Sequence, residues 1–466
     1  MVSSTTGLPA QFDPNTGQNV RWVTELGTST YSTPAIARGR VFVGTNNGNP
    51  RNPAHRGDRG VMFCLDEADG RFHWQLLVPK IPHDPYQDCP GVGITSTAVI
   101  EDDRVYIVSN RGEVLCLDFH GMINGNTGPF RDEARFLAWR GSDPVPLCDT
   151  DADIVWCYDM RHEVGIRTHD SANVSVLLHG DFLYTSTPNG VDRTHRHIPS
   201  PEAPGLIVLD RHTGRLLAQD DTGVGARIFH STFSSPSLGE VDGRTLVFYG
   251  GADGLVYCFE ALRKAPQPGE ISTLRLVWQF DCDPNAPRER IEQYQGNREI
   301  SPSSIIAPPV FHQGRVYVVA GGDPWHGKRQ AWIQCIDPSG TGDITSTGKI
   351  WSYPLHPHST STPAVQDGLV FITDFSGTIH CLDAATGKPH WTQQTKDEIW
   401  SSPLVADNKL YVGTRGGELW VFDASATRQV IHLARFNRPI TASPVAANGT
   451  LYVTTSNRLY AFAAGP

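Results

Sequence analysis

Residues 361–393, STPAVQDGLVFITDFSGTIHCLDAATGKPHWTQ, contain the pattern that decides the fold. Four short runs, PAV, GLVFIT, GTIHCLD and KPHWTQ, are separated by Gly, Asp and Ser, which favour tight turns between strands. Four strands in about 40 residues is the size of one blade of a β-propeller. We therefore interpret this segment as a four-stranded blade that runs from an inner to an outer strand.

The same unit recurs along the whole chain. Its anchor in the inner strand, Pro363, has equivalents at Pro403 and Pro444, at spacings of 40 and 41 residues. Earlier copies carry insertions, and their anchors are Pro34, Ala98, Val176, Pro236 and Pro309. Eight copies predict one all-β domain over residues 1–466, an eight-bladed propeller of four-stranded antiparallel blades.

The eighth copy lacks an outer strand of its own. It stops at Leu459–Phe462, after its third strand, whereas Gly17–Leu26 (GQNVRWVTEL) near the other end of the chain has the outer-strand pattern. We predict that Gly17–Leu26 completes the last blade. Such closure removes an exposed sheet edge, which would otherwise favour aggregation.

Two residue types recur at fixed positions in the blades. A tryptophan marks the outer strand, where one residue per blade cannot converge on a ligand, so we expect packing between blades from Trp22, Trp74, Trp156, Trp278, Trp351 and Trp391. A cysteine marks the third strand, at Cys64, Cys116, Cys258, Cys335 and Cys381. Equivalent atoms of different blades lie beyond the roughly 7 Å limit between Cα atoms of a disulfide. We predict that these five thiols are reduced and buried.

The composition argues against several classes of protein. Aromatic and β-branched residues occur along the whole chain, which is not typical of disorder. The net charge of −10 and the lack of a basic stripe argue against a nucleic-acid partner. No run approaches the ~20 apolar residues of a membrane span, and Met1–Thr6 is polar, without an apolar secretion segment.

The segments LDEADGRFHW (65–74) and LDAATGKPHW (382–391), with STPA and VFVGT before the first, resemble the PQQ-type repeat of quinoprotein-dehydrogenase-like propellers. The resemblance covers nearly the whole chain. It is strongest to secreted PQQ-binding-like repeat proteins of planctomycete-type bacteria, and more distant to the outer-membrane assembly scaffold lipoprotein. It implies a periplasmic or secreted protein whose signal is not among these residues, and it is more specific for fold than for function.

The cysteine pattern bears on the cofactor. Quinoprotein alcohol dehydrogenases of this superfamily hold their quinone against a vicinal disulfide, and some carry a haem motif. No adjacent cysteine pair, CxxC or CxxCH occurs in this chain. This argues against pyrroloquinoline quinone as the cofactor, and it leaves the pairing of Cys89, Cys148, Cys157 and Cys282 open.

Seven insertions fall on one predicted face of the propeller. They join a second to a third strand, or an outer strand to the next inner strand: Asn46–Arg59, Pro188–Pro204, Gly322–Gln330, Val78–Ile94, Asp159–Asn173, Gln219–Phe233 and Asp281–Ile306. Only the insertion at 119–151 joins a third to an outer strand, so we expect it on the opposite face. Because elaborated loops often carry function, the funnel on the seven-loop face is the predicted site.

Residues just before the inner strands should meet at the axis of the ring. We expect one polar pocket there, lined by His169, Asn173, Arg227, His230, His358 and Trp400. In an enzyme the three histidines would act as general acid or base, and Arg227 would hold an anionic group. Further expected ligand contacts are Tyr31, Asp170, Glu299, Glu398, Trp325 and His326, of which Trp325 suits stacking on a sugar ring.

Two His-x-His pairs are candidate metal ligands. In DRTHRH, His195 and His197 point the same way if the segment is extended; a solvated polar loop is the alternative. In LHPHST, His356 and His358 flank a proline at a funnel position.

Three functions fit these patterns. The first is an exported propeller whose funnel binds, and as an enzyme transforms, a small polar or carbohydrate ligand, with a divalent metal as the cofactor that its histidines suit. The second is a non-catalytic scaffold that presents its loops to partner proteins. The third is a quinoprotein-like dehydrogenase with a non-standard cofactor site.

Overall fold

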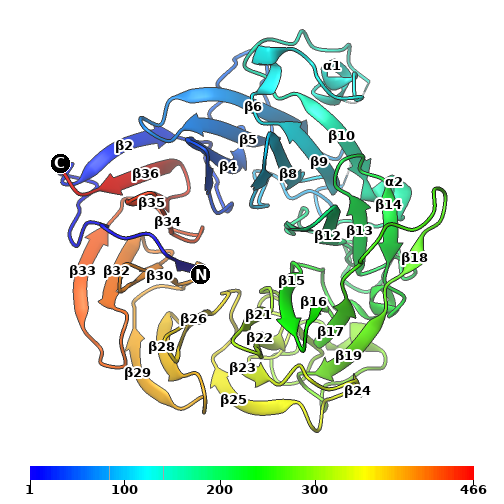
Figure 1. Cartoon of the computed structure of the whole chain (residues 1–466), viewed down its shortest axis with the longest axis vertical. Coiled ribbons are helices and arrows are strands. Elements are labelled where there is room, and N and C mark those ends of the chain that lie inside the picture. Colours follow the sequence, from blue (N-terminus) through cyan, green and yellow to red (C-terminus); the bar gives the residue numbers. More distant parts are fainter. Residues whose placement is uncertain (83, 140, 466) are drawn as a thin grey trace.

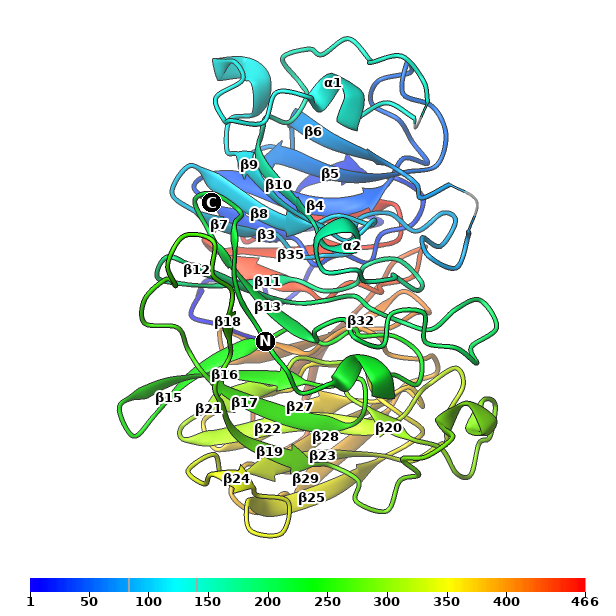
Figure 2. The same cartoon turned by 90° about the vertical axis from the view of Figure 1, so that its right-hand side faces the viewer.

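The computed structural model describes residues 1–82, 84–139 and 141–465, which form a ring of eight sheets around a central opening (Figure 1). Successive main strands of each blade pair antiparallel, from the inner strand outward. Figure 2 shows the ring from its side, with long loops projecting from the right-hand face. The predicted all-β, eight-bladed propeller is confirmed.

The first half of the chain forms blades 1 to 4. Blade 1 is β3 (Ala35–Ala37), β4 (Arg40–Asn46), β5 (Arg59–Asp66) and β6 (Phe72–Pro79), and blade 2 is β7 (Val99–Glu101), β8 (Arg104–Val108), β9 (Glu113–Asp118) and β10 (Ile154–Asp159). Blade 3 is β11 (Val176–His179), β12 (Phe182–Ser186), β13 (Leu206–Asp210), β14 (Leu216–Gln219) and β18 (Ser272–Thr273). Blade 4 is β15 (Ser237–Val241), β16 (Arg244–Gly250), β17 (Leu255–Glu260), β19 (Leu276–Asp281) and β24 (Gly342–Asp343).

The second half, with the N-terminal segment, forms blades 5 to 8. Blade 5 is β20 (Ser303–Ser304), β21 (Val310–His312), β22 (Arg315–Gly322), β23 (Ala331–Ile336) and β25 (Lys349–Leu355), and blade 6 is β26 (Ala364–Gln366), β27 (Leu369–Thr373), β28 (Thr378–Asp383) and β29 (Pro389–Gln394). Blade 7 is β1 (Val2–Ser3), β30 (Leu404–Ala406), β31 (Lys409–Gly413), β32 (Glu418–Asp423) and β33 (Val430–Arg435). Blade 8 is β2 (Val20–Glu25), β34 (Val445–Ala447), β35 (Thr450–Thr454) and β36 (Arg458–Ala463).

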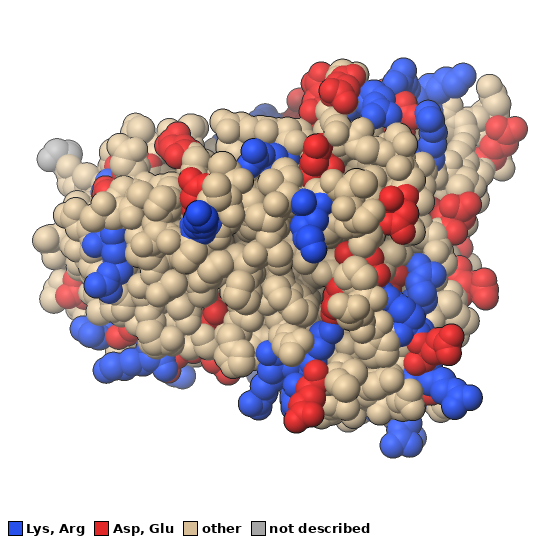
Figure 3. Space-filling model, turned by 90° about the horizontal axis from the view of Figure 1, so that it is seen from below, with Lys and Arg blue, Asp and Glu red and all other residues tan. Residues whose placement is uncertain are grey.

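The insertions hold the short helices: η1 (Gly121–Asn124), α1 (Glu133–Phe136), α2 (Met160–Glu163), η2 (Val224–Arg227) and η3 (Ile291–Tyr294). Among the residues described, no helix has the length and apolarity needed to cross a membrane. On the face drawn in Figure 3, Lys and Arg are interspersed with Asp and Glu.

The ring closes through the N-terminal segment. Strand β2 pairs antiparallel with β36, with Val23 opposite Tyr460 and Thr24 opposite Leu459. The first residues continue inward, where β1 lies parallel to β30 in blade 7. The predicted closing strand is therefore confirmed, and the edge of β36 is covered.

The tryptophans of the outer strands connect neighbouring blades. In all six positions the indole Nε1 donates to a backbone carbonyl of the next blade at 2.9–3.0 Å. The pairs are Trp22 to Glu67, Trp74 to Phe119, Trp156 to Arg211, Trp278 to Pro338, Trp351 to Ala384 and Trp391 to Ser425. The six rings are buried, so their role is packing between blades, as predicted.

The repeated cysteines are free thiols in the core. All five third-strand cysteines are unpaired and buried, as predicted, and Cys89, Cys148, Cys157 and Cys282 are unpaired as well. Burial raises the pKa of Cys116 to about 12 and that of Cys335 to about 11. These side chains act as small apolar residues.

The insertion at 119–151 extends farther than its position in the sequence indicates. It follows the outer edge of blade 1, where Asp151 forms a parallel bridge with Gln75 of β6. Farther along, the Arg59 side chain donates to the carbonyl of Leu137 (2.6 Å) and lies over the ring of Trp139 (4.7 Å). Because Arg59 ends a loop of the seven-loop face, the insertion is not confined to the opposite face.

Candidate functional site

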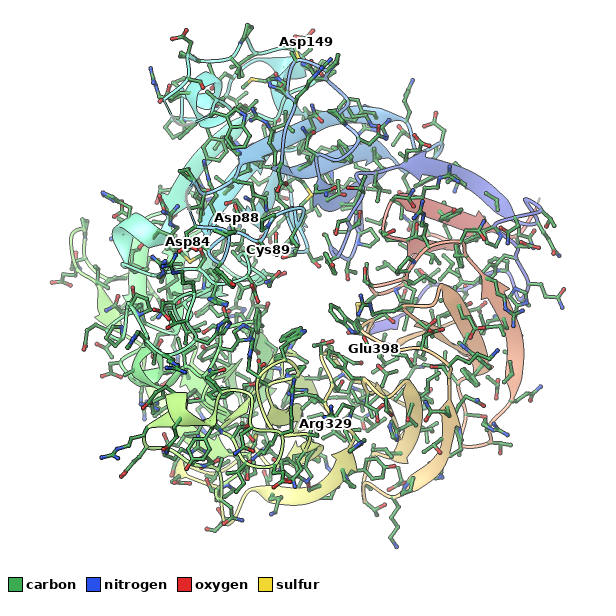
Figure 4. All side chains as sticks on the ribbon, turned by 180° about the vertical axis from the view of Figure 1, so that it is seen from behind. Asp84, Asp88, Cys89, Asp149, Arg329 and Glu398 are labelled. Carbon is green, nitrogen blue, oxygen red and sulfur yellow. The ribbon has the colours of Figure 1, made fainter. Side chains whose placement is uncertain are left out.

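A central cavity of about 470 Å³ lies where the inner strands converge. Residues that directly precede the inner strands of all eight blades line it: Tyr31, Thr95, Asn173, Phe233, Ile306, Thr360, Trp400 and Thr441. The insertions add Cys89, Asp170 and Trp325. In Figure 4, Cys89 and Glu398 lie beside the central opening.

One side of the cavity is an aromatic wall around Trp400. Tyr31 stacks on Trp400 with ring centroids 6.4 Å apart, and Trp325 meets it edge-on at 6.2 Å. Behind it, Phe375 lies parallel at 5.5 Å and the Arg415 guanidinium sits 4.3 Å from the ring. Tyr31 and Trp325 remain 37% and 39% exposed, so fixed aromatic faces are available to a ligand.

Four imidazoles gather beside Asp170, which lines the cavity, but the imidazoles themselves are not among its lining residues. His169 and Asp170 come from the loop between blades 2 and 3, His195 from the β12–β13 loop, His230 from the loop between blades 3 and 4, and His326 from the β22–β23 loop. Neighbouring ring centroids lie 4.3–5.4 Å apart. We call these five residues the histidine cluster.

Hydrogen bonds on Nδ1 fix two of the rings. His169 Nδ1 donates to the carbonyl oxygen of Val191 (2.8 Å), and His230 Nδ1 donates to Asp323 Oδ2 (2.9 Å). Their Nε2 atoms therefore face the cluster. His169 Nε2 lies 3.1 Å from His195 Nε2, and His230 Nε2 lies 3.3 Å from Asp170 Oδ2.

Asp323 also shapes the loop that carries His326. Its second oxygen accepts hydrogen bonds from the backbone N–H groups of Trp325 (3.0 Å) and His326 (2.8 Å). One buried carboxylate thus orients His230 and holds the GDPWHG turn (322–327) against the cavity.

The charges within the cluster are unevenly distributed. Burial lowers the pKa of His169, His195 and His326, and neighbouring imidazoles lower it further; for His326 it falls to about 4. Burial also lowers the pKa of His230, but the carboxylates of Asp323 and Asp170 outweigh this effect and raise it to about 9. The cluster therefore combines three neutral imidazoles, one imidazolium and a carboxylate at neutral pH.

The backbone of the cluster adopts left-handed conformations at non-glycine residues. The φ angles are 58° at Asp170, 73° at Ser171 and 56° at His195. Such conformations are strained for L-residues and concentrate at functional sites.

The DRTHRH segment is a tight turn and not an extended strand. Asp192 Oδ1 accepts from the backbone N–H groups of Thr194, Arg196 and His197. His195 consequently faces the cluster while His197 is exposed. The extended conformation on which the His195–His197 prediction depends is not present, because the Asp192 side chain holds the backbone between them in a turn.

His358 and Arg227, which the sequence predicts to line the pocket, are not among the residues that line the central cavity. His358 is buried and shares a separate pocket of about 230 Å³ with His356 and Glu398. Burial lowers the pKa of His358 to about 4. Arg227 pairs with Asp253 (2.9 Å) and Tyr257 (2.8 Å) of blade 4.

Glu299, Glu398 and Asn173 have local roles in the loops. Glu299 is exposed in the 281–306 loop. Glu398 accepts from Arg415 (2.9 Å) and from Trp400 Nε1 (3.1 Å). Asn173 accepts from Thr95 (2.8 Å) at the cavity wall.

The β6–β7 loop contributes residues that no repeat position marks. The ring of Tyr86 packs against His169 (5.9 Å) and His195 (6.1 Å). On the same loop, Asp88 accepts from Ser171 Oγ (2.9 Å), which ties it to the residue after Asp170. Figure 4 shows Asp84, Asp88 and Cys89 together near the opening. Their only signal in the sequence is the length of the insertion.

Comparison with known proteins gives a family match. The family model described as outer membrane protein assembly factor BamB matches residues 1–215 and 329–465, more than half of the chain. The segment between the two matched ranges contains His230, Asp323 and His326.

Solved structures of low sequence identity share the fold. BamB from Moraxella catarrhalis has a TM-score of 0.58 at 15% identity, covering 95% of this chain and 98% of that chain. Quinohemoprotein alcohol dehydrogenase from Comamonas testosteroni has a TM-score of 0.58 at 12% identity, covering 95% of this chain and 76% of that chain.

Curated relatives match over short stretches. Quinohemoprotein alcohol dehydrogenase of Comamonas testosteroni is 24% identical over 138 residues, which is 27% of this chain and 18% of that protein. Quinohemoprotein alcohol dehydrogenase ADH IIB of Pseudomonas putida is 25% identical over 167 residues, 32% of this chain and 20% of that protein. The match spans about a fifth of the length of these relatives.

Proposed function

We propose that this chain, which belongs to the PQQ-like propeller family described as outer membrane protein assembly factor BamB, binds a small polar ligand in its central cavity. One observation carries the proposal. Residues from all eight blades line one cavity of about 470 Å³, and the histidine cluster reaches it through Asp170. A cavity with apolar walls and a few convergent polar groups is the usual form of a small-molecule site.

The wall of the cavity suits a carbohydrate. Tyr31, Trp325 and Trp400 offer flat faces on which the C–H side of a sugar ring can stack. Residues with hydroxyl groups also line the wall: Thr33, Thr95, Ser175, Ser235, Thr360, Ser402, Thr441 and Ser443. Together they match a ligand that has both apolar faces and hydroxyl groups.

Pyrroloquinoline quinone, which the PQQ-like fold implies, does not fit this cavity. The quinone carries three carboxylates, whereas the charged residue of the lining is Asp170, with no Lys or Arg among the described residues that line it. The chain also has no adjacent cysteines.

A protein-binding scaffold is the second candidate function. The family match favours it, since the matched family is described as an assembly factor. A scaffold would contact partners through its loops and would not need the cavity residues.

Differential scanning fluorimetry against a panel of sugars and sugar acids tests the proposal. For a compound that binds, Trp400→Ala should weaken affinity about tenfold or more, because stacking and buried apolar area contribute at least about 1.4 kcal/mol. Trp139→Ala is the matched control, since its ring lies over Arg59 in the 119–151 insertion. If no compound binds, or if Trp400→Ala binds like the wild type, the proposal is wrong.

A further inference from the structure

We propose that His169, His195, His230 and Asp170 form a binding site for a divalent transition-metal ion beside the central cavity, which Asp170 lines. The inference deepens the proposed function, since the ion would face the same cavity. The metal site can be tested by metal binding alone, without a ligand in the cavity.

Two pairs of the proposed ligands already have the spacing expected around one ion, and the other pairs would have to move closer. Two ligands of a tetrahedral ion lie about 3.3 Å apart when each is roughly 2.0–2.1 Å from the metal. His169 Nε2 and His195 Nε2 are 3.1 Å apart, and His230 Nε2 and Asp170 Oδ2 are 3.3 Å apart. One ring nitrogen from each of the three histidines lies within 4.8 Å of the others.

The surrounding hydrogen bonds have the arrangement found around metal ligands. A ligating histidine usually donates its other N–H to a carboxylate or a backbone carbonyl, which fixes the tautomer and turns the free nitrogen toward the metal. His230 does so with Asp323, and His169 does so with the carbonyl of Val191. Two of the three imidazoles are therefore already oriented.

The Nε2 atom of His230 is buried and faces a carboxylate. His230 is 3% exposed, and its Nε2 atom makes no hydrogen bond of good geometry among the described residues but lies 3.3 Å from Asp170 Oδ2. Metal ligation requires a deprotonated imidazole nitrogen, so a bound ion would displace the Nε2 proton of His230. The ion would then take the place of that proton between His230 Nε2 and the Asp170 carboxylate.

The backbone supports the same centre. Asp170 and His195 both have left-handed φ angles, of 58° and 56°. The ligands come from three loops that are far apart in the sequence, and two of these residues would gain a direct bond that offsets local strain.

The donor set selects the class of metal. Three imidazoles and one carboxylate favour Zn²⁺, Cu²⁺, Ni²⁺ or Co²⁺ over Ca²⁺ and Mg²⁺, which prefer oxygen ligands. The Asp170 side chain is 41% exposed and lines the cavity. A polar ligand in the cavity would thus reach the ion from the Asp170 side.

Titration of the chelator-treated full chain with Zn²⁺, followed by calorimetry, tests the site. We expect one ion per chain, and Co²⁺ should give the visible absorption of a nitrogen-rich low-symmetry site. His195→Gln and His230→Gln should each weaken Zn²⁺ binding at least about 100-fold, and Asp323→Asn about 10- to 100-fold. His197→Gln is the matched control, because His197 is exposed in the same turn and should bind as the wild type does.

His230 is buried, so circular dichroism must establish the fold of that variant. His195 is partly exposed in a loop, and His195→Gln carries the test if His230→Gln does not fold. The inference is overturned if Zn²⁺ does not bind, or if His195→Gln binds it as tightly as His197→Gln. Failure to bind Zn²⁺ while a cavity ligand still binds would overturn this inference alone; Zn²⁺ binding without any cavity ligand would overturn only the proposed function.

Discussion

At the scale of single residues, a tryptophan in the outer strand ties each of six blades to the next. Trp278 is fully buried, and its Nε1 donates to the Pro338 carbonyl at 3.0 Å. Trp278→Phe keeps a large apolar ring but leaves that carbonyl without its donor, so it should lower the free energy of unfolding by about 1–3 kcal/mol. Equilibrium denaturation measures the change.

Trp420→Phe is the control for this experiment. Trp420 lies on a third strand and its Nε1 donates to Glu418 of the same strand (3.1 Å), so no hydrogen bond between blades is lost. Equal stability of Trp278→Phe and the wild type would contradict the role assigned to the outer-strand tryptophans.

At the scale of elements, closure of the ring depends on β2. Trp22 and Leu26 are buried there at 7% and 1% exposure, and the strand covers the edge of β36. Deletion of residues 1–26 should lower the free energy of unfolding by at least about 5 kcal/mol, from loss of this apolar burial, and should promote aggregation through the freed edge. Thermal melting and light scattering measure both effects.

Deletion of residues 1–6 is the control, because it removes only β1 and should lower the free energy of unfolding by less. Equal melting curves for the longer deletion and the wild type would refute closure by β2.

The elements that repeat could be predicted from the sequence, and those that do not repeat could not. Gly17–Leu26 was identifiable because its pattern matches the outer strands of the other copies. Strands β18 and β24 are two-residue pieces that pair in parallel with the outer edges of blades 3 and 4. Strands this short have no periodic sequence pattern of their own, because their position depends on the edge strand with which they pair.

At the scale of the whole molecule, the ring geometry made the cavity predictable from the sequence. The arrangement of the histidine cluster was not predictable in the same way, because it depends on the conformation of the loops. Residues before the inner strands occupy equivalent positions, so symmetry brings Tyr31, Asn173 and Trp400 to one place. His195 faces the cluster only because Asp192 bends its turn. Ring symmetry does not bring the Arg227 side chain to the cavity, because Asp253 and Tyr257 hold its guanidinium in blade 4.

A bound ion would join loops of different blades, and limited proteolysis can detect this. Trypsin can cut the β12–β13 loop after Arg193 and Arg196, which are exposed on either side of His195. Cleavage requires local opening, and a metal bond at His195 opposes opening, so one equivalent of Zn²⁺ should slow cleavage there several-fold. Cleavage after Arg51 and Arg56, exposed in the β4–β5 loop of blade 1, should be unchanged, and His195→Gln should abolish the protection. Mass spectrometry of the peptides separates these sites, and equal slowing at all four would show that Zn²⁺ does not act through this cluster.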